Sequence, residues 1–237
     1  MEKWDGAFAF GHSMVVFRGR TADNTLHAHA SVQLSIAHTG TLTMLDANGL
    51  THRAQGLITR PDHLHKLQPA EAMTLILIEP HLPLANALLS ACGDAGTSTL
   101  DPALSQSLQQ ANSPQDCLAT LSKLAPINNP VLDSRIAQAL VWLLSASAPD
   151  AIAQAAAMCG VSDSRLRALA RKSLGTSLSQ WLIWRKLEAS GRALAAGAPL
   201  AEAAYAGGFA DQAHFTRTMR KVLGITPKLA SQIVRHT

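Results

Sequence analysis

The sequence predicts a multidomain α+β protein with an N-terminal β-barrel, a helical linker and an all-α C-terminal domain that holds two helix-turn-helix units. Short apolar segments rich in β-branched residues occupy residues 7–79, as expected for an all-β domain. A short Ala-rich helix, a small-residue turn and a basic helix occur twice between residues 151 and 230, which is an internal repeat. These two observations predict domains at 1–80 and 128–237, with a linker at 81–127.

Charge divides the chain in the same way. Residues 151–237 hold 12 Lys and Arg against 4 acids, a net charge of +8, whereas residues 1–150 hold 8 against 12, a net charge of −4. This asymmetry indicates a polyanionic partner for the C-terminal part. The start of the chain lacks the pattern of a signal peptide, and no apolar run reaches the ~20 residues that cross a bilayer. Three scattered cysteines form no disulfide framework. We therefore expect a cytoplasmic protein without a membrane partner.

Five segments have the composition of strands, and polar or glycine-containing turns separate them. Short strands at this spacing favour a sandwich or a barrel. The expected strands cover residues 13–18, 32–37, 41–45, 56–59 and 73–79.

Histidines are concentrated in this region. His27 and His29 would share one face of a strand, Gln33 would stay on that face, and His63 and His65 form a second pair. A barrel mouth is a usual place for a small-molecule site. The spacing resembles the cupin family, and the matching residues are His27, His29, Gln33, Gly40, Gly56, Pro61 and His65.

In metal-binding cupins, the resemblance implies, two histidines, a glutamate and a third histidine hold one ion. Gln33 stands where that glutamate would be, and a neutral amide is a poorer ligand for a divalent ion. Three interpretations stay open: ordinary polar residues, an effector pocket lined by His27, His29, Gln33 and His65, or a transition-metal site at His27, His29 and His65.

Beyond the barrel, helices are expected at 82–91, 101–110 and 114–124, with Asp101 and Ser113 as N-caps. They could pack on the barrel or form a dimer face. Residues 126–130 contain two prolines and form the best domain boundary. An amphipathic helix follows at 133–146, with Ile136, Leu140, Leu143 and Leu144 directed inward.

The two helix-turn-helix units cover residues 152–178 and 200–231. Their basic helices end at Gly175 and Gly224, and glycine is the usual residue just past a helix end. A helix over 178–196, with Trp181, Trp184, Leu187 and Leu194 buried, would join them. Its length of roughly 28 Å is close to one DNA turn of about 34 Å, so the two units could enter successive major grooves.

One motif in the second unit is specific. Gly208-Phe209-x-Asp211-Gln212-x-His214-Phe215-x-Arg217, followed by Gly224-x-Thr226-Pro227, resembles the AraC-type (AraC/XylS) family of transcription regulators. Ala170 and Met219 depart from it, since the family usually has Phe there. The resemblance implies that Ser164, Arg167, Ala168, Gln212, Ala213, His214, Thr216 and Arg217 face DNA bases. Arg165, Arg171, Lys172, Arg220 and Lys221 would contact phosphates.

We thus expect a transcription regulator, more often an activator in the resembled family, that binds double-stranded promoter DNA and is controlled by a small-molecule effector. The family analogy adds a homodimer, and RNA polymerase as partner of an activator. The alternatives are a metal-responsive regulator, a metal-dependent cupin enzyme with a DNA-binding domain, and an architectural DNA binder. The sequence predicts no catalytic residues, so we do not expect an enzyme. It predicts no cofactor beyond the divalent transition metal of the third interpretation of the histidines.

Overall fold

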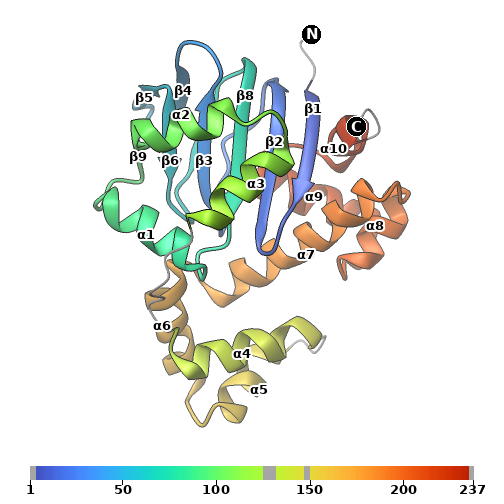
Figure 1. Ribbon diagram of the computed structural model, residues 1–237. Helices are drawn as coiled ribbons and strands as arrows, with labels where there is room; N and C mark the ends of the chain where they lie inside the picture. Colours follow the sequence, from blue (N-terminus) through green and yellow to red (C-terminus); the bar gives the residue numbers. More distant parts are fainter. Residues whose placement is uncertain (1–3, 125–131, 147–149, 235–237) are drawn as a thin grey trace.

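The computed structural model describes residues 4–124, 132–146 and 150–234, and its N-terminal part contains two β-sheets (Figure 1). The larger sheet has the strand order β1-β2-β8-β3-β6-β9 and the smaller one β5-β4-β7. The strands are β1 (Asp5–Phe10), β2 (Met14–Thr21), β3 (Val32–Ala37), β4 (Leu42–Asp46), β5 (Thr51–Ala54), β6 (Gly56–Thr59), β7 (His65–Leu67), β8 (Ala70–Ile78) and β9 (Thr97–Thr99).

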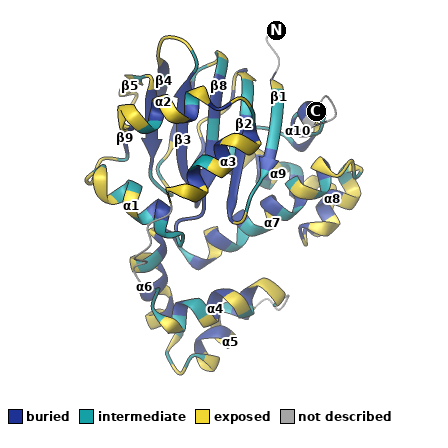
Figure 2. Cartoon of the chain, viewed as in Figure 1, coloured by how far each residue is buried: buried dark blue, intermediate teal, exposed yellow. Residues whose placement is uncertain are grey.

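The five strands expected from the sequence are confirmed as β2, β3, β4, β6 and β8. Strands β3 and β8 pair antiparallel in the middle of the larger sheet, with Leu34 opposite Ile76. Both faces of these strands are covered, which explains the nearly continuous apolar run of β8 from Met73 to Ile78 and the burial of the polar Gln33 and Ser35 in β3. Figure 2 shows this burial as a dark band through the centre of the sheet.

Three helices cover one face of the larger sheet: α1 (Pro83–Ala91), α2 (Pro102–Gln110) and α3 (Pro114–Lys123) (Figure 1). The Asp101 and Ser113 side chains accept hydrogen bonds from Leu104 N and Asp116 N, so both predicted N-caps are confirmed. Leu108 and Leu121 lie in one core with the sheet.

Packing on the barrel and a dimer face were both left open for residues 82–124, and the dimer face stays a prediction. The segment packs on the sheet, and it also contributes β9, which pairs with β6. It is therefore part of the N-terminal core and not a purely helical linker. The boundary predicted at residues 126–130 lies outside the described residues.

Among the described residues, the C-terminal part contains helices and no strands, which confirms the predicted α+β organisation. Helix α7 belongs to two cores: Leu178 and Trp181 pack with α4, α5 and α6, whereas Leu187 and Leu194 pack with α8, α9 and α10. The helices are α4 (Ser134–Ser145), α5 (Ala151–Met158), α6 (Asp163–Leu174), α7 (Leu178–Ala195), α8 (Leu200–Ala206), α9 (Gln212–Leu223) and α10 (Pro227–Val234).

The two predicted glycine stops are confirmed. Gly175 after α6 and Gly224 after α9 have φ angles of 66° and 70°, in the left-handed region. In α4, Ile136, Leu140 and Leu143 are buried as predicted, but the inward direction expected for Leu144 is wrong. Its side chain is 53% exposed, because the buried stripe of α4 runs through Ala139 instead.

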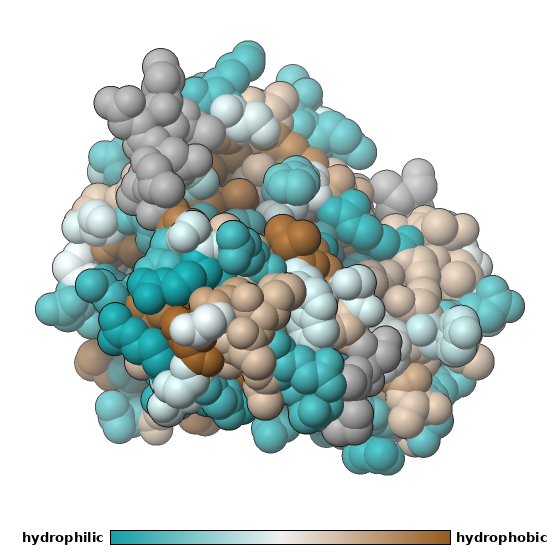
Figure 3. All heavy atoms as spheres, turned by 90° about the horizontal axis from the view of Figure 1, so that it is seen from below, coloured by the Kyte–Doolittle hydropathy of each residue, from teal (hydrophilic) through white to brown (hydrophobic). Residues whose placement is uncertain are grey.

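Helix α7 runs beneath the larger sheet, on the side of it opposite α2 and α3, and α10 lies beside β1 (Figure 1). Val15 and Leu77 of the sheet form one apolar cluster with Trp184 of α7. The lower face of the molecule carries hydrophilic groups with apolar patches between them (Figure 3). None of the described helices is long and apolar enough to cross a membrane.

Candidate effector cavity and DNA-binding surfaces

Three buried histidines form a compact cluster next to β3. The ring centroids of His27, His29 and His65 lie 4.5 to 5.7 Å apart. The prediction that His27 and His29 belong to a regular strand is wrong, since they lie in the irregular segment between β2 and β3. They meet His65 because the backbones of His27 and His65 exchange two hydrogen bonds of 2.9 Å.

The backbone fixes the tautomer of all three imidazoles. Each Nδ1 lies within 2.8–3.0 Å of a carbonyl oxygen, that of Thr25, Ser31 or His63. A carbonyl only accepts, so Nδ1 carries the proton and a neutral imidazole keeps a lone pair on Nε2. One nitrogen from each histidine lies within 4.8 Å of the other two, which makes the cluster a possible set of metal ligands.

The Gln33 side chain closes the cluster. Its amide oxygen lies 3.0 Å from His29 Nε2 and 3.2 Å from His65 Nε2, and its NH2 group donates to Ser35 Oγ at 3.0 Å. An amide oxygen cannot donate to an imidazole lone pair, so in this orientation two neutral histidines receive no hydrogen bond from Gln33. A half-turn of the amide would present its NH2 group to both imidazoles, whereas the oxygen in its present place suits a bound cation.

Burial keeps these histidines uncharged. It lowers the pKa of His27 to about 4, with a further contribution from His29. Burial also lowers the pKa of His29 and, most strongly, that of His65. All three are therefore neutral at pH 7.

A mainly apolar cavity of about 100 Å³ lies between the larger sheet and helices α7, α9 and α10. The sheet contributes Phe17 and Leu77, and the helices contribute Trp184, Leu187 and Leu223. This cavity joins the two parts of the chain.

Three of the four predicted pocket residues, His27, His29 and Gln33, line the cavity at its polar end. His65 does not line it and lies against His27 and His29 instead. Sequence reasoning missed the helical wall of the cavity, because it predicted Trp184 only as a core residue. The apolar stripe that contains Trp184 indicated that this side chain is buried, but not that it faces a cavity.

The side chains predicted to face DNA bases lie on α6 and α9, near the N-termini of these helices. Seven of the eight are exposed, and Thr216 is half-buried. The five predicted phosphate contacts are also exposed. Four of the base-facing residues, Gln212, Ala213, Thr216 and Arg217, line one shallow hollow on α9.

Local contacts set the starting geometry of these helices. Ser162 and Asp211 accept hydrogen bonds from Arg165 N and His214 N and so cap α6 and α9. Arg167 Nε donates to Asp163 at 2.8 Å, so a DNA base would compete with this exposed pair. His214 packs edge-on against Phe209.

A comparison with known families identifies these helices. Residues 155–231 match the family model described as a helix-turn-helix domain, of the AraC type. This part of the chain is an AraC-type helix-turn-helix domain. No curated protein matches the sequence.

Solved structures share the fold of nearly the whole chain. ToxT from Vibrio cholerae O395 is 11% identical, with a TM-score of 0.61 over 95% of this chain and 99% of its own. Wild-type ToxT from V. cholerae SCE256 with bound unsaturated fatty acid is 12% identical, with a TM-score of 0.59 over 100% and 99%. With the AraC-type domain, this likeness supports a DNA-binding transcription regulator.

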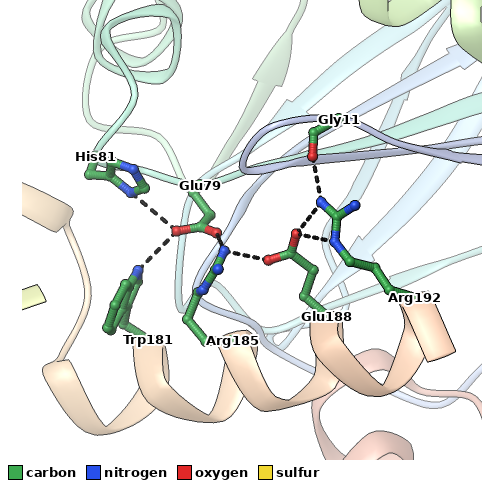
Figure 4. Close-up of polar contacts among 7 residues, drawn as sticks. All are labelled: Gly11, Glu79, His81, Trp181, Arg185, Glu188 and Arg192. Atoms are coloured by element: carbon green, nitrogen blue, oxygen red, sulfur yellow. Dashed lines mark hydrogen bonds and ion pairs between the residues drawn. The ribbon is translucent and has the colours of Figure 1, made fainter. Parts of the chain in front are cut away.

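A chain of polar contacts joins the sheet to the AraC-type domain (Figure 4). Buried Glu79, just after β8, accepts hydrogen bonds from Trp181 Nε1 at 3.0 Å and from Arg185 at 2.5 Å. Arg185 also bonds Glu188, which binds Arg192, and Arg192 donates to the Gly11 carbonyl. Three residues spaced along α7 are thereby tied to the N-terminal domain.

Proposed function

We propose that this protein is a transcription regulator whose promoter binding is controlled by a small-molecule effector in the interdomain cavity. The observation that carries the proposal is that the N-terminal sheet and the C-terminal helices both line the cavity. Phe17 and Leu77 lie on one side, and Trp184 and Leu223 lie on the other. A ligand there touches the helices of the AraC-type domain directly. Its binding free energy therefore depends on how that domain is docked.

A second contact supports this coupling. Gly224, which ends α9, packs against the loop that carries His27: Thr25 N donates to Gly224 O at 3.3 Å. A side-chain carbon on Gly224 would lie 2.8 Å from His27 Nδ1. A ligand that displaces His27 at the polar end of the cavity would thus displace the end of α9, the basic helix of the second helix-turn-helix unit.

The DNA contacts are proposed to be the exposed residues of α6 and α9 described above. The DNA sequence that the protein prefers is first selected by its binding from a random duplex library, and binding of the variants to that sequence is then measured. Arg167→Ala should weaken binding to the selected sequence by about 1–3 kcal/mol and relax one base position. Lys172→Ala should weaken selected and random DNA equally and reduce the salt dependence by about one counterion. Arg53→Ala, an exposed arginine on β5, is the matched control and should change neither.

Effector control is tested separately. Compounds that raise the thermal unfolding temperature are measured for their effect on the Kd for the selected duplex. A true effector should change this Kd at least about five-fold. Gly191→Leu should abolish the effect, because Gly191 lines the cavity and a side-chain carbon there would contact the Phe10 ring at 3.4 Å. Cavity binders that leave DNA affinity unchanged would contradict the coupling.

We further propose that the regulator activates transcription and acts as a homodimer. The support is the AraC-type domain and the family resemblance of the motif that ends at Pro227. In vitro transcription with RNA polymerase on the selected sequence tests the sign of regulation, and sedimentation velocity tests the dimer. Reduced transcription, or a monomer at the concentration that binds DNA, would reject the respective proposal.

A second candidate function is a metal-responsive regulator or a metal-dependent cupin enzyme. The supporting observation is the set of three buried imidazoles whose tautomers leave Nε2 unprotonated. His27, His29 and His65 would hold the ion beside the Gln33 amide oxygen, and the ion would supply Lewis acidity. The test is the metal content of untagged protein beside a His27→Ala/His29→Ala variant. About one ion per chain, lost in the variant, would favour this candidate.

A further inference from the structure

We infer that the cavity is built for an uncharged ligand with an apolar body and a hydrogen-bond acceptor, such as a ketone, ester or amide, that receives the indole N–H of Trp184 or Trp4. This inference rests on the proposed function and names the chemical class of its effector. Three properties of the lining carry it: its aromatic surface, its unpartnered polar atoms and its charge.

The body of the ligand would meet aromatic rings. The ring of Phe8 lies 5.1 Å from that of Phe17 and 6.3 Å from that of Phe10, and all three line the cavity with Trp4 and Trp184. Leucines from the sheet and from α7 fill the remaining apolar wall. Such a surface favours a compact, largely apolar molecule, since burial of apolar area is the main source of affinity in a site of this kind.

Three polar atoms of the lining have no partner within the described residues: Trp4 Nε1, Trp184 Nε1 and Asn24 Oδ1. All three residues are more than nine-tenths buried. Trp181, only three residues before Trp184, instead donates its indole N–H to Glu79. A buried donor without an acceptor is rare and destabilising. A hydrogen-bond acceptor on the ligand would therefore replace the hydrogen bond to water that the indole N–H loses on folding.

The charge of the lining disfavours ions of either sign. Among the described residues that line the cavity, none is Lys or Arg, and the only carboxylate is Glu188. Both of its oxygens are engaged by Arg185 and Arg192. An anionic ligand would therefore meet a carboxylate without a free cation, and a cationic ligand would compete with two guanidinium groups.

At the polar end, His27 and His29 direct their Nδ1 atoms at the backbone carbonyls of Thr25 and Ser31 and add no carboxylate or guanidinium group to the lining. ToxT has been solved with a fatty acid and with (E)-4-(8-methylnaphthalen-1-yl)but-3-enoic acid, both carboxylic acids, at 10–12% identity to this chain. The lining of the cavity in this protein instead predicts an uncharged ligand.

Three compounds of nearly equal size distinguish an uncharged, an anionic and a cationic ligand: 4-phenylbutan-2-one, 3-phenylpropanoic acid and 3-phenylpropylamine. Calorimetric titration of the full chain at pH 7.5 should give a Kd at least about ten-fold lower for the ketone than for the acid or the amine. Trp184→Phe and Trp4→Phe each keep a ring but remove one donor, and one of the two variants should weaken ketone binding at least about five-fold. An acid or amine that binds as tightly as the ketone would overturn the inference.

Indole N–H resonances of the wild-type protein give a readout that does not depend on a variant's folding. The resonance of Trp184 or Trp4 should move when the ketone binds, whereas that of Trp181, already bonded to Glu79, should stay in place. Ketone binding that moves neither cavity indole would also overturn the inference. Failure of all three compounds to bind at millimolar concentration would reject the cavity as an effector site, and with it the proposed effector control. A charged binder that alters DNA affinity would overturn the inference alone.

Discussion

Replacing Glu79 by Gln tests how firmly the AraC-type domain is held against the sheet. Glu79 is 1% exposed, and its carboxylate accepts hydrogen bonds from Trp181 and Arg185 of α7 (Figure 4). His81 Nδ1 lies 3.1 Å from the same carboxylate. Glutamine keeps the size of the side chain and one acceptor oxygen for Trp181, but it removes the charge that Arg185 needs.

The pKa of Glu79 gives the magnitude. Burial alone would raise this pKa, but the contact with His81 and the charge of Arg185 outweigh burial and lower it from 4.5 to about 2. Each pKa unit corresponds to about 1.4 kcal/mol, so the ionised form stabilises the fold by about 3 kcal/mol at neutral pH. Arg185 keeps its bond to Glu188, which limits the expected loss in Glu79→Gln to about 2–3 kcal/mol.

Urea unfolding followed by tryptophan fluorescence measures this loss. At pH 7.5 the free energy of unfolding of the variant should be lower than that of the wild type by about 2–3 kcal/mol. Because the folded pKa is depressed, the contribution of Glu79 is complete above pH 4.5 and disappears as the pH falls toward 2, so the difference from wild type should shrink over that range. Glu71→Gln, which breaks the exposed ion pair with Arg20, is the control and should cost at most about 0.5 kcal/mol. A loss as small as the control's at pH 7.5 would refute the reasoning.

Three further substitutions have defined outcomes. Asp211→Ala removes the N-cap of α9 and should lower stability by about 1 kcal/mol in thermal unfolding. Gly224→Ala should cost clearly more than Gly49→Ala, because both have a positive φ but only Gly224 packs against His27; equal losses in urea unfolding would contradict this contact. Gln33→Glu should bind Ni²⁺ or Zn²⁺ at least about ten-fold more tightly than wild type by calorimetry, since a carboxylate is the better ligand; unchanged affinity would exclude the cluster as a latent metal site.

The central strands could be predicted from the sequence, but the peripheral ones could not. Strand β8 reads as an apolar run because α2 and α3 cover one face of the sheet and α7 the other, and β3 has apolar residues at alternate positions. Strands β5 (THRA), β7 (HKL) and β9 (TST) are short and polar, and nothing in their own residues specifies pairing. β9 pairs with β6 nearly forty residues earlier in the chain, and such long-range contacts leave no local periodicity.

The candidate site was also only partly predictable from the sequence. Spacing identified His27, His29 and Gln33, although the reason given for their common face, a regular strand, was wrong. The backbone bonds between His27 and His65 bring the cluster together instead. The helical wall of the cavity depends on how two domains dock, and an apolar stripe on α7 indicates only that it is buried. The caps and glycine stops of α6 and α9 were predictable because they are local.

Helix α7 gives the two helix-turn-helix units different attachments to the N-terminal domain. At its start, Thr176 Oγ1 donates to Asp62 and Trp181 to Glu79, and Trp181 belongs to the core of the first unit. Further along, Leu187 and Leu194 line the cavity and pack in the core of the second unit. Under the proposed effector control, a ligand in the cavity would contact α9 and α10 of the second unit directly, whereas no described residue of α4–α6 lines the cavity. Effector binding should accordingly change the separation of the two recognition helices, which is the quantity that decides whether both fit successive grooves of one DNA duplex.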